Sequence, residues 1–288
     1  MKQNAYQNQV AIITGASAGI GRALALQLAG QGAKVAIAAR RAERLEEVAA
    51  EFRSHARKSP SGEGEILVIP TDVSDEAQCK ALVEKTVAAF GRLDMLINNA
   101  GLAVVALLRE YVDLRLFRHV MDVNFYGAVH CTYYALPHIM QSKGRIVTVS
   151  SLGGKGGLPF NSSYTASKYA LHGFYDSLRM EMKPHGVSVS VICPYWVVTE
   201  FHEAYLDKNG QARGKQGRAL YTKKMMTAER CAEITLEAAY RRKRELLMGP
   251  GGLLVWLKLI APDFLDRMAI KVILEPIARR TKAGKIEA

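Results

Sequence analysis

Cysteine is scarce in this chain of 288 residues, and its four thiols, Cys79, Cys131, Cys193 and Cys231, lie far apart. None of them forms a CxxC pair or another metal-type spacing, so we predict reduced thiols and no metal site. The chain also lacks a run of about 18 apolar residues, which argues against a membrane-spanning helix. Its first residues, MKQNAYQNQVAIITG, have too little apolar length for a signal peptide. These absences favour a cytoplasmic protein.

Acidic residues are outnumbered, since 27 Asp and Glu stand against 39 Lys and Arg, for a net charge of +12. This balance favours anionic partners, such as a phosphorylated cofactor, an acidic carrier, nucleic acid or an anionic membrane surface. No nucleic-acid-binding motif occurs, and the excess charge is spread over a glycine-rich segment and the C-terminal tail. We therefore expect no nucleic-acid partner.

Short apolar runs alternate with helical patterns along the chain. We predict strands at VAIITG, KVAIAAR, EILVIPTDVS, LDMLINNAG, GRIVTVSS, VSVSVICP and ELLMG. Strands separated by helices form parallel sheets that are covered on both faces. The prediction is a doubly wound α/β fold of about seven strands in one domain, residues 1–249. Within it, residues 202–224 are rich in glycine and basic side chains and are predicted to form a lid, and residues 250–288 form a C-terminal helical extension.

The segment TGASAGIG, residues 14–21, follows the first predicted strand and opens the first helix. Its glycines permit a tight turn and a close approach of the backbone to a ligand. The helix N-terminus then offers free N–H groups to a pyrophosphate. We predict that a dinucleotide contacts Gly15, Ser17, Ala18, Gly19, Ile20 and Gly21.

A second feature is the pair Tyr164 and Lys168 in the segment SSYTASKYAL. Residues four apart on a helix share one face. The pair is either a solvated surface contact or a proton-transfer site, in which the ammonium makes the phenolic proton easier to remove. The pair alone leaves both alternatives open.

Five motifs in order resemble the short-chain dehydrogenase/reductase superfamily. They are TGxxxGIG, NNAG at residues 98–101, Asn124, Ser151, and the YxxxK of Tyr164 and Lys168, with Ser151 thirteen residues before Tyr164. The chain is most similar to the 11β-hydroxysteroid dehydrogenase-like branch, over residues 9–249. The resemblance implies a Rossmann-type fold, a nicotinamide cofactor, interconversion of a ketone and an alcohol, and a homodimer or homotetramer formed through the helices that carry Asn124 and Tyr164.

The resemblance also implies a role for each catalytic residue. Tyr164 acts as general acid in reduction and general base in oxidation, with its pKa lowered by Lys168 and by the oxidised nicotinamide. Ser151 holds the substrate oxygen and stabilises the charge that forms on it. Lys168 also binds the nicotinamide ribose, and the counterpart of Asn124 holds a water that continues the proton relay.

The acidic residue that ends the second strand in NAD enzymes of this type is missing. That position is Ala39, and Arg40 and Arg41 follow it. Guanidinium groups bind phosphate well, so we predict NADP(H) as the cofactor. The resemblance adds further cofactor contacts at Asp72, Val73, Asn98, Ala100, Gly101, Tyr164, Lys168, Val197 and Thr199.

One departure from the family pattern concerns the substrate. Tyr195, beside Trp196, stands where glycine commonly follows the proline. An aromatic pocket and an apolar tail favour a hydrophobic, lipid-like ketone or alcohol of steroid or sphingoid type. The basic lid instead favours a 3-oxoacyl thioester on a carrier protein or coenzyme A. A catalytically silent NADP-binding regulator is the non-enzyme alternative, and the intact set of four catalytic residues argues against it.

The tail contains the apolar run LLVWLKLIA, residues 253–261, which is far too short to span a bilayer. The last 48 residues carry 11 basic and 5 acidic side chains. Apolar residues beside basic ones suit an interfacial segment on an anionic membrane. The alternative is that the apolar side chains cover the substrate cleft or contact a partner subunit.

Overall fold

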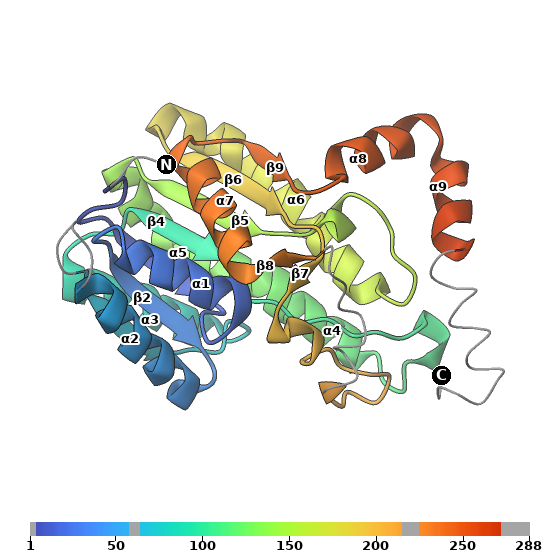
Figure 1. Ribbon diagram of the computed structural model, residues 1–288, viewed down its shortest axis with the longest axis horizontal. Coiled ribbons are helices and arrows are strands. Elements are labelled where there is room, and N and C mark those ends of the chain that lie inside the picture. Colours follow the sequence, from blue (N-terminus) through green and yellow to red (C-terminus); the bar gives the residue numbers. More distant parts are fainter. Residues whose placement is uncertain (1–3, 58–63, 215–224, 272–288) are drawn as a thin grey trace.

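The computed structural model describes residues 4–57, 64–214 and 225–271. A seven-stranded parallel sheet lies at its centre, in the order β3-β2-β1-β4-β5-β6-β9 (Figure 1). The strands are β1 (Val10–Thr14), β2 (Lys34–Ala39), β3 (Ile66–Pro70), β4 (Met95–Asn98), β5 (Arg145–Val149), β6 (Ser188–Cys193) and β9 (Glu245–Leu247). The predicted doubly wound α/β fold is confirmed.

Helices cover both faces of this sheet. One face is covered by α1 (Gly19–Ala29), α2 (Ala42–Arg57) and α7 (Ala228–Tyr240), and the other by α3 (Glu76–Phe90), α5 (Gly127–Ser142) and α6 (Ser162–Met182). Alternate residues of each strand enter opposite cores, as Ile13 and Ile12 of β1 do. Burial on both faces explains why the strands are almost continuously apolar.

The order of the strands reverses between β1 and β4, and such a reversal is where doubly wound sheets bind ligands. Short elements gather at this end of the sheet. They are η1 (Leu108–Glu110), α4 (Arg115–Met121), the π turn η2 (Asp122–Tyr126), η3 (Leu152–Gly154), η5 (Glu200–His202) and the paired strands β7 (Val197–Val198) and β8 (Met226–Thr227). One more short helix, η4 (Lys183–His185), lies elsewhere, between α6 and β6.

The predicted lid is described as far as residue 214, and residues 215–224 lie outside the described part of the chain. Leu206 bridges both Val104 and Ala212. Its N–H donates to the carbonyl of Ala103 at 2.9 Å. The first half of the segment is therefore fastened to the loop that follows β4.

The predicted extension begins with α8 (Gly251–Ile260) and α9 (Pro262–Ala269), and residues 272–288 lie outside the described chain. These two helices project from the body of the molecule (Figure 1). Among the described residues, no helix combines the length and the apolar character needed to cross a membrane.

Candidate active site

The loop between β1 and α1 lies against the end of β4. Gly15 has φ of +66°, and a Cβ there would lie 2.7 Å from Cα of Ala100. A Cβ on Gly21 would lie 2.4 Å from the carbonyl oxygen of Gly15. Side chains at these two positions would therefore push the loop away from the sheet, and glycine is required at both.

The first turn of α1 faces the open end of the sheet without a side-chain cap. Ala18 precedes the helix, and the first turn contains no acidic residue. The first N–H groups of a helix have no partner within it, and the positive end of its dipole favours an anion. Thr199 lies across from this turn, since its Cβ is 3.0 Å from the position of a Cβ on Gly19. The predicted phosphate contacts and Thr199 thus come together.

The end of β2 is basic. Arg41 donates a hydrogen bond from Nη2 to Oγ of Ser17, at 3.1 Å, so one guanidinium lies against the glycine-rich loop. Burial alone would raise the pKa of Asp72, but hydrogen bonds from Ser74 and the charge of Arg40 hold it below its usual value. The two arginines therefore occupy different places: Arg41 beside the loop, and Arg40 near the carboxylate of Asp72.

Tyr164 and Lys168 lie one turn apart on α6. Nζ of Lys168 is 5.5 Å from the centroid of the Tyr164 ring and donates to the carbonyl of Val149, at the end of β5, at 2.9 Å. Ser151 follows β5 and caps η3, with its Oγ accepting the N–H of Gly153 at 3.0 Å. The three predicted catalytic side chains are therefore brought together at the carboxyl end of β5.

Burial shifts both titrating groups toward their neutral forms. It raises the pKa of Tyr164 to about 12, although the hydrogen bond with Ser151 acts in the opposite direction. It lowers the pKa of Lys168 from 10.5 to about 8. Lys168 is buried and Tyr164 is partly buried. Titratable groups with pKa values perturbed in this way are typical of catalytic sites.

Asn124 lies in the π turn η2, where a single wide turn interrupts the helix between α4 and α5. Its Nδ2 donates to the carbonyl of Leu102 and to Oγ of Ser167, both at 2.8 Å. Its Oδ1 accepts the N–H of Leu102 at 2.6 Å. The side chain is fully engaged in tying the loop after β4 to α6. A π turn at such a position is common near functional sites.

The two asparagines of NNAG face different ways. Asn98 points into the core, where Nδ2 donates to the hydroxyl of Tyr175 at 2.8 Å. Asn99 braces the glycine-rich loop, with Nδ2 donating to the carbonyls of Thr14 and Gly15 at 3.0 and 3.2 Å. Asn98 was predicted as a cofactor contact and Asn99 was not, because the motif alone does not show which side chain braces the loop.

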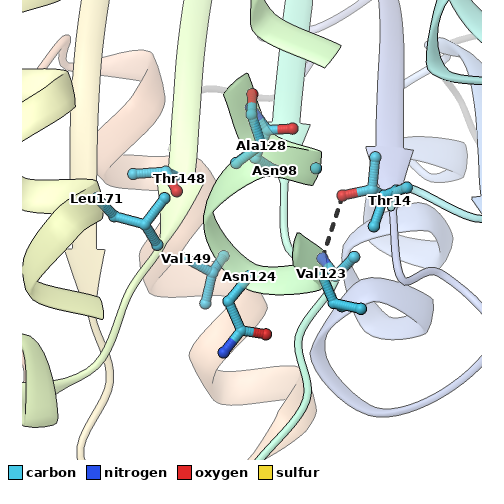
Figure 2. Close-up of a pocket in the computed structure, with 11 residues that line it drawn as sticks. Thr14, Asn98, Val123, Asn124, Ala128, Thr148, Val149 and Leu171 are labelled. Atoms are coloured by element: carbon cyan, nitrogen blue, oxygen red, sulfur yellow. Dashed lines mark hydrogen bonds between the residues drawn. The ribbon is translucent and has the colours of Figure 1, made fainter. Parts of the chain in front are cut away.

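Figure 2 shows the hollow between β1, β4 and β5 where several of these residues meet. Thr14 accepts the N–H of Ala100 at 3.1 Å. A Cβ on Gly101 would lie 3.6 Å from Oδ1 of Asn124 and 3.8 Å from Nζ of Lys168. Three further predicted contacts are buried or partly buried near this end of the sheet: Ile20, Val73 and Val197.

Four ring side chains near Tyr164, which we call the aromatic wall, are Trp196, Phe201, His202 and Tyr205. Trp196 was predicted to shape the substrate pocket, whereas Phe201, His202 and Tyr205 were not predicted. Ring centroids of Phe201 and Tyr164 are 6.2 Å apart. Trp196 and His202 stack at 5.8 Å, and Phe201 and Tyr205 meet edge to face at 5.0 Å. Burial lowers the pKa of His202. The signal in the sequence was the cluster of rings from residue 195 to 205.

Known proteins resemble this chain in sequence and in structure. A protein-family model described as short chain dehydrogenase matches residues 9–210. A "Dehydrogenase/reductase SDR family protein 7-like" of Dictyostelium discoideum is 34% identical over 93% of this chain and 83% of its own length. The "11-beta-hydroxysteroid dehydrogenase-like 3" of Arabidopsis thaliana is 40% identical over 67% of this chain, and the match spans 60% of that protein.

Among solved structures, a short-chain dehydrogenase/reductase from Burkholderia phymatum in complex with NAD has a TM-score of 0.80 and 26% identity, over 92% of this chain and 97% of its own. The ordered motifs, the sheet and these likenesses lead to one conclusion. The chain belongs to the short-chain dehydrogenase/reductase superfamily of oxidoreductases, in its 11β-hydroxysteroid dehydrogenase-like branch.

Proposed function

We propose that the protein is an NADP(H)-dependent oxidoreductase that interconverts a ketone and a secondary alcohol on a hydrophobic, lipid-like substrate of steroid or sphingoid type. The observation that carries this proposal is the position of Tyr164, which lies beside Lys168, Ser151 and Phe201 of the aromatic wall. The flat rings suit an apolar substrate with one carbonyl or hydroxyl group.

The chain's own residues divide the proton chemistry among them. A bound nicotinamide would supply or accept the hydride. Tyr164 donates a proton to the oxygen that becomes an alkoxide in reduction, and recovers it in oxidation. Ser151 donates a hydrogen bond to the same oxygen. Lys168 would stabilise the phenolate of Tyr164 and hold the nicotinamide ribose, and Asn124 would hold the water that continues the proton relay.

NADP(H) is favoured over NAD(H) by the basic end of β2. The strand ends at Ala39 without a carboxylate to repel a 2′-phosphate. Ser17 and Arg41 already form a hydrogen-bonded pair beside the loop, with Arg40 nearby. A phosphate oxygen placed between them would receive charge-assisted hydrogen bonds. The remaining cofactor contacts are those predicted on the glycine-rich loop, the NNAG segment and Thr199.

Two kinds of further partner belong to the proposal. Exposed large side chains on α5 and α6, such as Tyr133 and Met180, support a homodimer or homotetramer formed through these helices. Exposed apolar side chains on α8 and α9 support contact of the tail with an anionic membrane.

The experiment that tests the activity is NADPH oxidation across a panel of carbonyl compounds: an 11-ketosteroid, 3-ketosphinganine, acetoacetyl-CoA and acetophenone. We expect the steroid or the sphingoid ketone to react fastest. Fastest turnover of acetoacetyl-CoA would favour the thioester reductase instead, and NADPH binding without any turnover would favour the silent regulator. Tyr164→Phe should keep NADPH binding and lose about 10³-fold in kcat, because it removes only the transferable proton.

A further inference from the structure

A buried polar cluster lies one helical turn from Lys168, and none of its members belongs to the predicted site. It consists of His172 on α6, Cys193 at the end of β6 and Glu245 at the start of β9, with Ser150 and Lys155 at its edges. His172 is 7% exposed and Cys193 is fully buried. Polar side chains at this depth are costly unless they have defined partners.

The imidazole of His172 faces a different partner with each ring nitrogen. Nε2 lies 3.2 Å from Oγ of Ser150 and 3.6 Å from Sγ of Cys193. Nδ1 lies 3.4 Å from Oε1 of Glu245, which also pairs with the ammonium of Lys155 at 2.6 Å. Nε2 therefore lies beside a hydroxyl and a thiol, and Nδ1 beside a carboxylate.

The same residue types bind metals, and ligand atoms of His172, Cys193 and Glu245 lie within 4.8 Å of one another. A single ion, however, takes only one nitrogen of an imidazole, whereas here the thiol and the carboxylate face opposite nitrogens. Lys155 already neutralises Glu245, and burial raises the pKa of Cys193 to about 12, which disfavours the thiolate that a metal requires. The cluster is better suited to hold segments of the protein together.

Those segments carry the catalytic groups. Ser150 stands between Val149, whose carbonyl accepts from Lys168, and Ser151. The N–H of Ser150 donates to the carbonyl of Ile192 on β6, at 2.7 Å. Its Oγ lies 3.5 Å from the carbonyl of Lys168 as well as beside the imidazole. Through Ser150, the imidazole is therefore connected to the strand end that positions both Lys168 and Ser151.

The turn that follows Ser151 closes over the ring. A Cβ on Gly154 would lie 2.7 Å from Cδ2 of His172 and 2.8 Å from its Nε2, so the glycine backbone packs against the imidazole. Lys155, the next residue, reaches Glu245. The turn is thus fixed by the ring on one side and by the ion pair on the other.

We infer that His172 is a positioning residue, which fixes residues 150 and 151 against α6 and thereby sets the distance from Ser151 to Tyr164, with Glu245 orienting its ring. The inference rests on the proposed function, in which Ser151 and Tyr164 share the reacting oxygen. The hydrogen bond from Ser151 opposes the rise in the pKa of Tyr164 that burial causes. A displaced Ser151 therefore leaves that pKa higher.

Among the described residues, few charged or titratable groups surround Tyr164 and His172. Tyr164 faces Lys168 and Cys193, besides Ser151. His172 faces Cys193, Glu245 and, through the carboxylate, Lys155.

The first experiment is amide hydrogen exchange on the full chain without cofactor. His172→Leu replaces the imidazole with an apolar side chain of similar size and removes the polar contacts of both ring nitrogens. Amide exchange at residues 150–156 should therefore accelerate more than about tenfold. Thr86→Ala is the matched control, because it removes a buried hydroxyl that donates to the carbonyl of Leu82 at 2.7 Å on a distant helix. Glu245→Gln should produce a smaller acceleration of exchange in the same segment. It replaces His172→Leu as the test variant if that protein does not fold. Unchanged exchange at residues 150–156 in a folded variant overturns the inference.

The second experiment separates positioning from simple stabilisation. The assay uses NADP⁺ and an alcohol, either an 11β-hydroxysteroid or 1-phenylethanol, whichever is oxidised faster. The kcat should rise with pH as Tyr164 ionises. In His172→Leu and Ser150→Ala, the midpoint of this rise should move up by about half a unit or more, whereas Thr86→Ala should leave it unmoved. If Tyr164→Phe remains active, the proposed function fails. If Tyr164→Phe is inactive and the midpoint does not move, the positioning role alone fails.

Discussion

Lys168 is 3% exposed, which is rare for an ammonium group. Its hydrogen bond to Val149 compensates only part of the lost hydration, and burial lowers its pKa from 10.5 to about 8. The cofactor-free protein therefore carries a cost at neutral pH for a charge that the proposed catalysis requires. Functional residues often conflict with stability in this way.

The cost of burying the charge of Lys168 predicts that the free energy of unfolding depends on pH. Below pH 8, Lys168 is protonated in both states and the full cost is present. Between about pH 8 and 10.5 the unfolded chain binds more protons, so the free energy of unfolding rises with pH. From pH 7.5 to 9.5, wild type should gain about 2 kcal/mol relative to Lys168→Met. Urea unfolding of both proteins across this range measures it, and parallel curves would contradict it. Tyr164 stays protonated in the folded state of both proteins across this range, since burial raises its pKa to about 12, so its contribution cancels.

The two arginines after β2 should differ in how they read the cofactor. Arg41, which binds Ser17, lies beside the glycine-rich loop, whereas Arg40 is partly compensated by Asp72. Arg41→Ala should lower kcat/KM for NADPH about 10- to 100-fold and leave NADH nearly unchanged. Arg40→Ala, the matched control, should have a smaller effect. Equal ratios of kcat/KM for NADPH and NADH in wild type and Arg41→Ala would exclude Arg41 as the reader of the 2′-phosphate.

Motif residues were predictable from the sequence because their chemistry depends on spacing. Tyr164 and Lys168 share a helix face, and Gly15 follows a strand, whatever the surroundings. Phe201 and His172 were not predictable in this way, because each acts through residues that are distant in sequence and near only in the folded chain. Phe201 meets Tyr164 across 37 positions, and Glu245 reaches His172 across 73.

At the scale of elements, the π turn at Asn124 depends on one side chain. Its three hydrogen bonds satisfy both backbone groups of Leu102 and the hydroxyl of Ser167. Asn124→Ala should lower the free energy of unfolding by about 2–4 kcal/mol, since buried polar groups lose their partners. Ser167→Ala removes only one of these bonds and should cost about 1 kcal/mol. Chemical denaturation compares them, and equal losses would mean that the contacts to Leu102 contribute little.

All seven strands of the sheet were predicted, because strands buried on both faces leave a strong apolar signal. The third and fourth were predicted too long, since EILVIPTDVS continues past Pro70 into a turn and LDMLINNAG continues past Asn98 into a loop. The two-residue strands β7 and β8 were missed. Elements of this length have no periodicity of their own and form only where other parts of the chain hold them.

At the scale of the whole molecule, α5 and α6 leave large side chains exposed, including Tyr133 at 69% and Met180 at 72%. Burial of such surface favours association. Light scattering at micromolar concentration should therefore give at least twice the chain mass of 31.7 kDa. The double substitution Tyr133→Glu, Met180→Glu should lower the mass toward one chain, while Ile260→Glu on α8 should not. A wild-type mass of one chain would contradict the assembly.

The tail helices present a second exposed apolar surface, formed by Leu253, Trp256, Leu259, Ile260 and Phe264. Lys258 holds α8 to the body, since its Nζ donates to the carbonyl of Lys155 at 3.0 Å and to the hydroxyl of Tyr169. Ile260 is 74% exposed, and Trp256 is 67% exposed. Side chains this exposed do not cover a substrate cleft within one chain. Their exposure argues against the alternative in which the tail covers the substrate cleft.

We expect this surface to bind anionic membranes, where apolar burial and attraction of the basic tail add together. Full-length protein should float with phosphatidylserine-containing vesicles at low salt, and less with neutral vesicles or at about 0.5 M salt, where surface charges are screened. Trp256→Ser with Ile260→Ser should abolish flotation and leave NADPH binding intact. The matched control is Tyr133→Ser with Met180→Ser, which removes similar exposed area from α5 and α6 and should still float. Absence of wild-type flotation at low salt would exclude membrane contact. Flotation that persists without Trp256 and Ile260 would assign it to another surface.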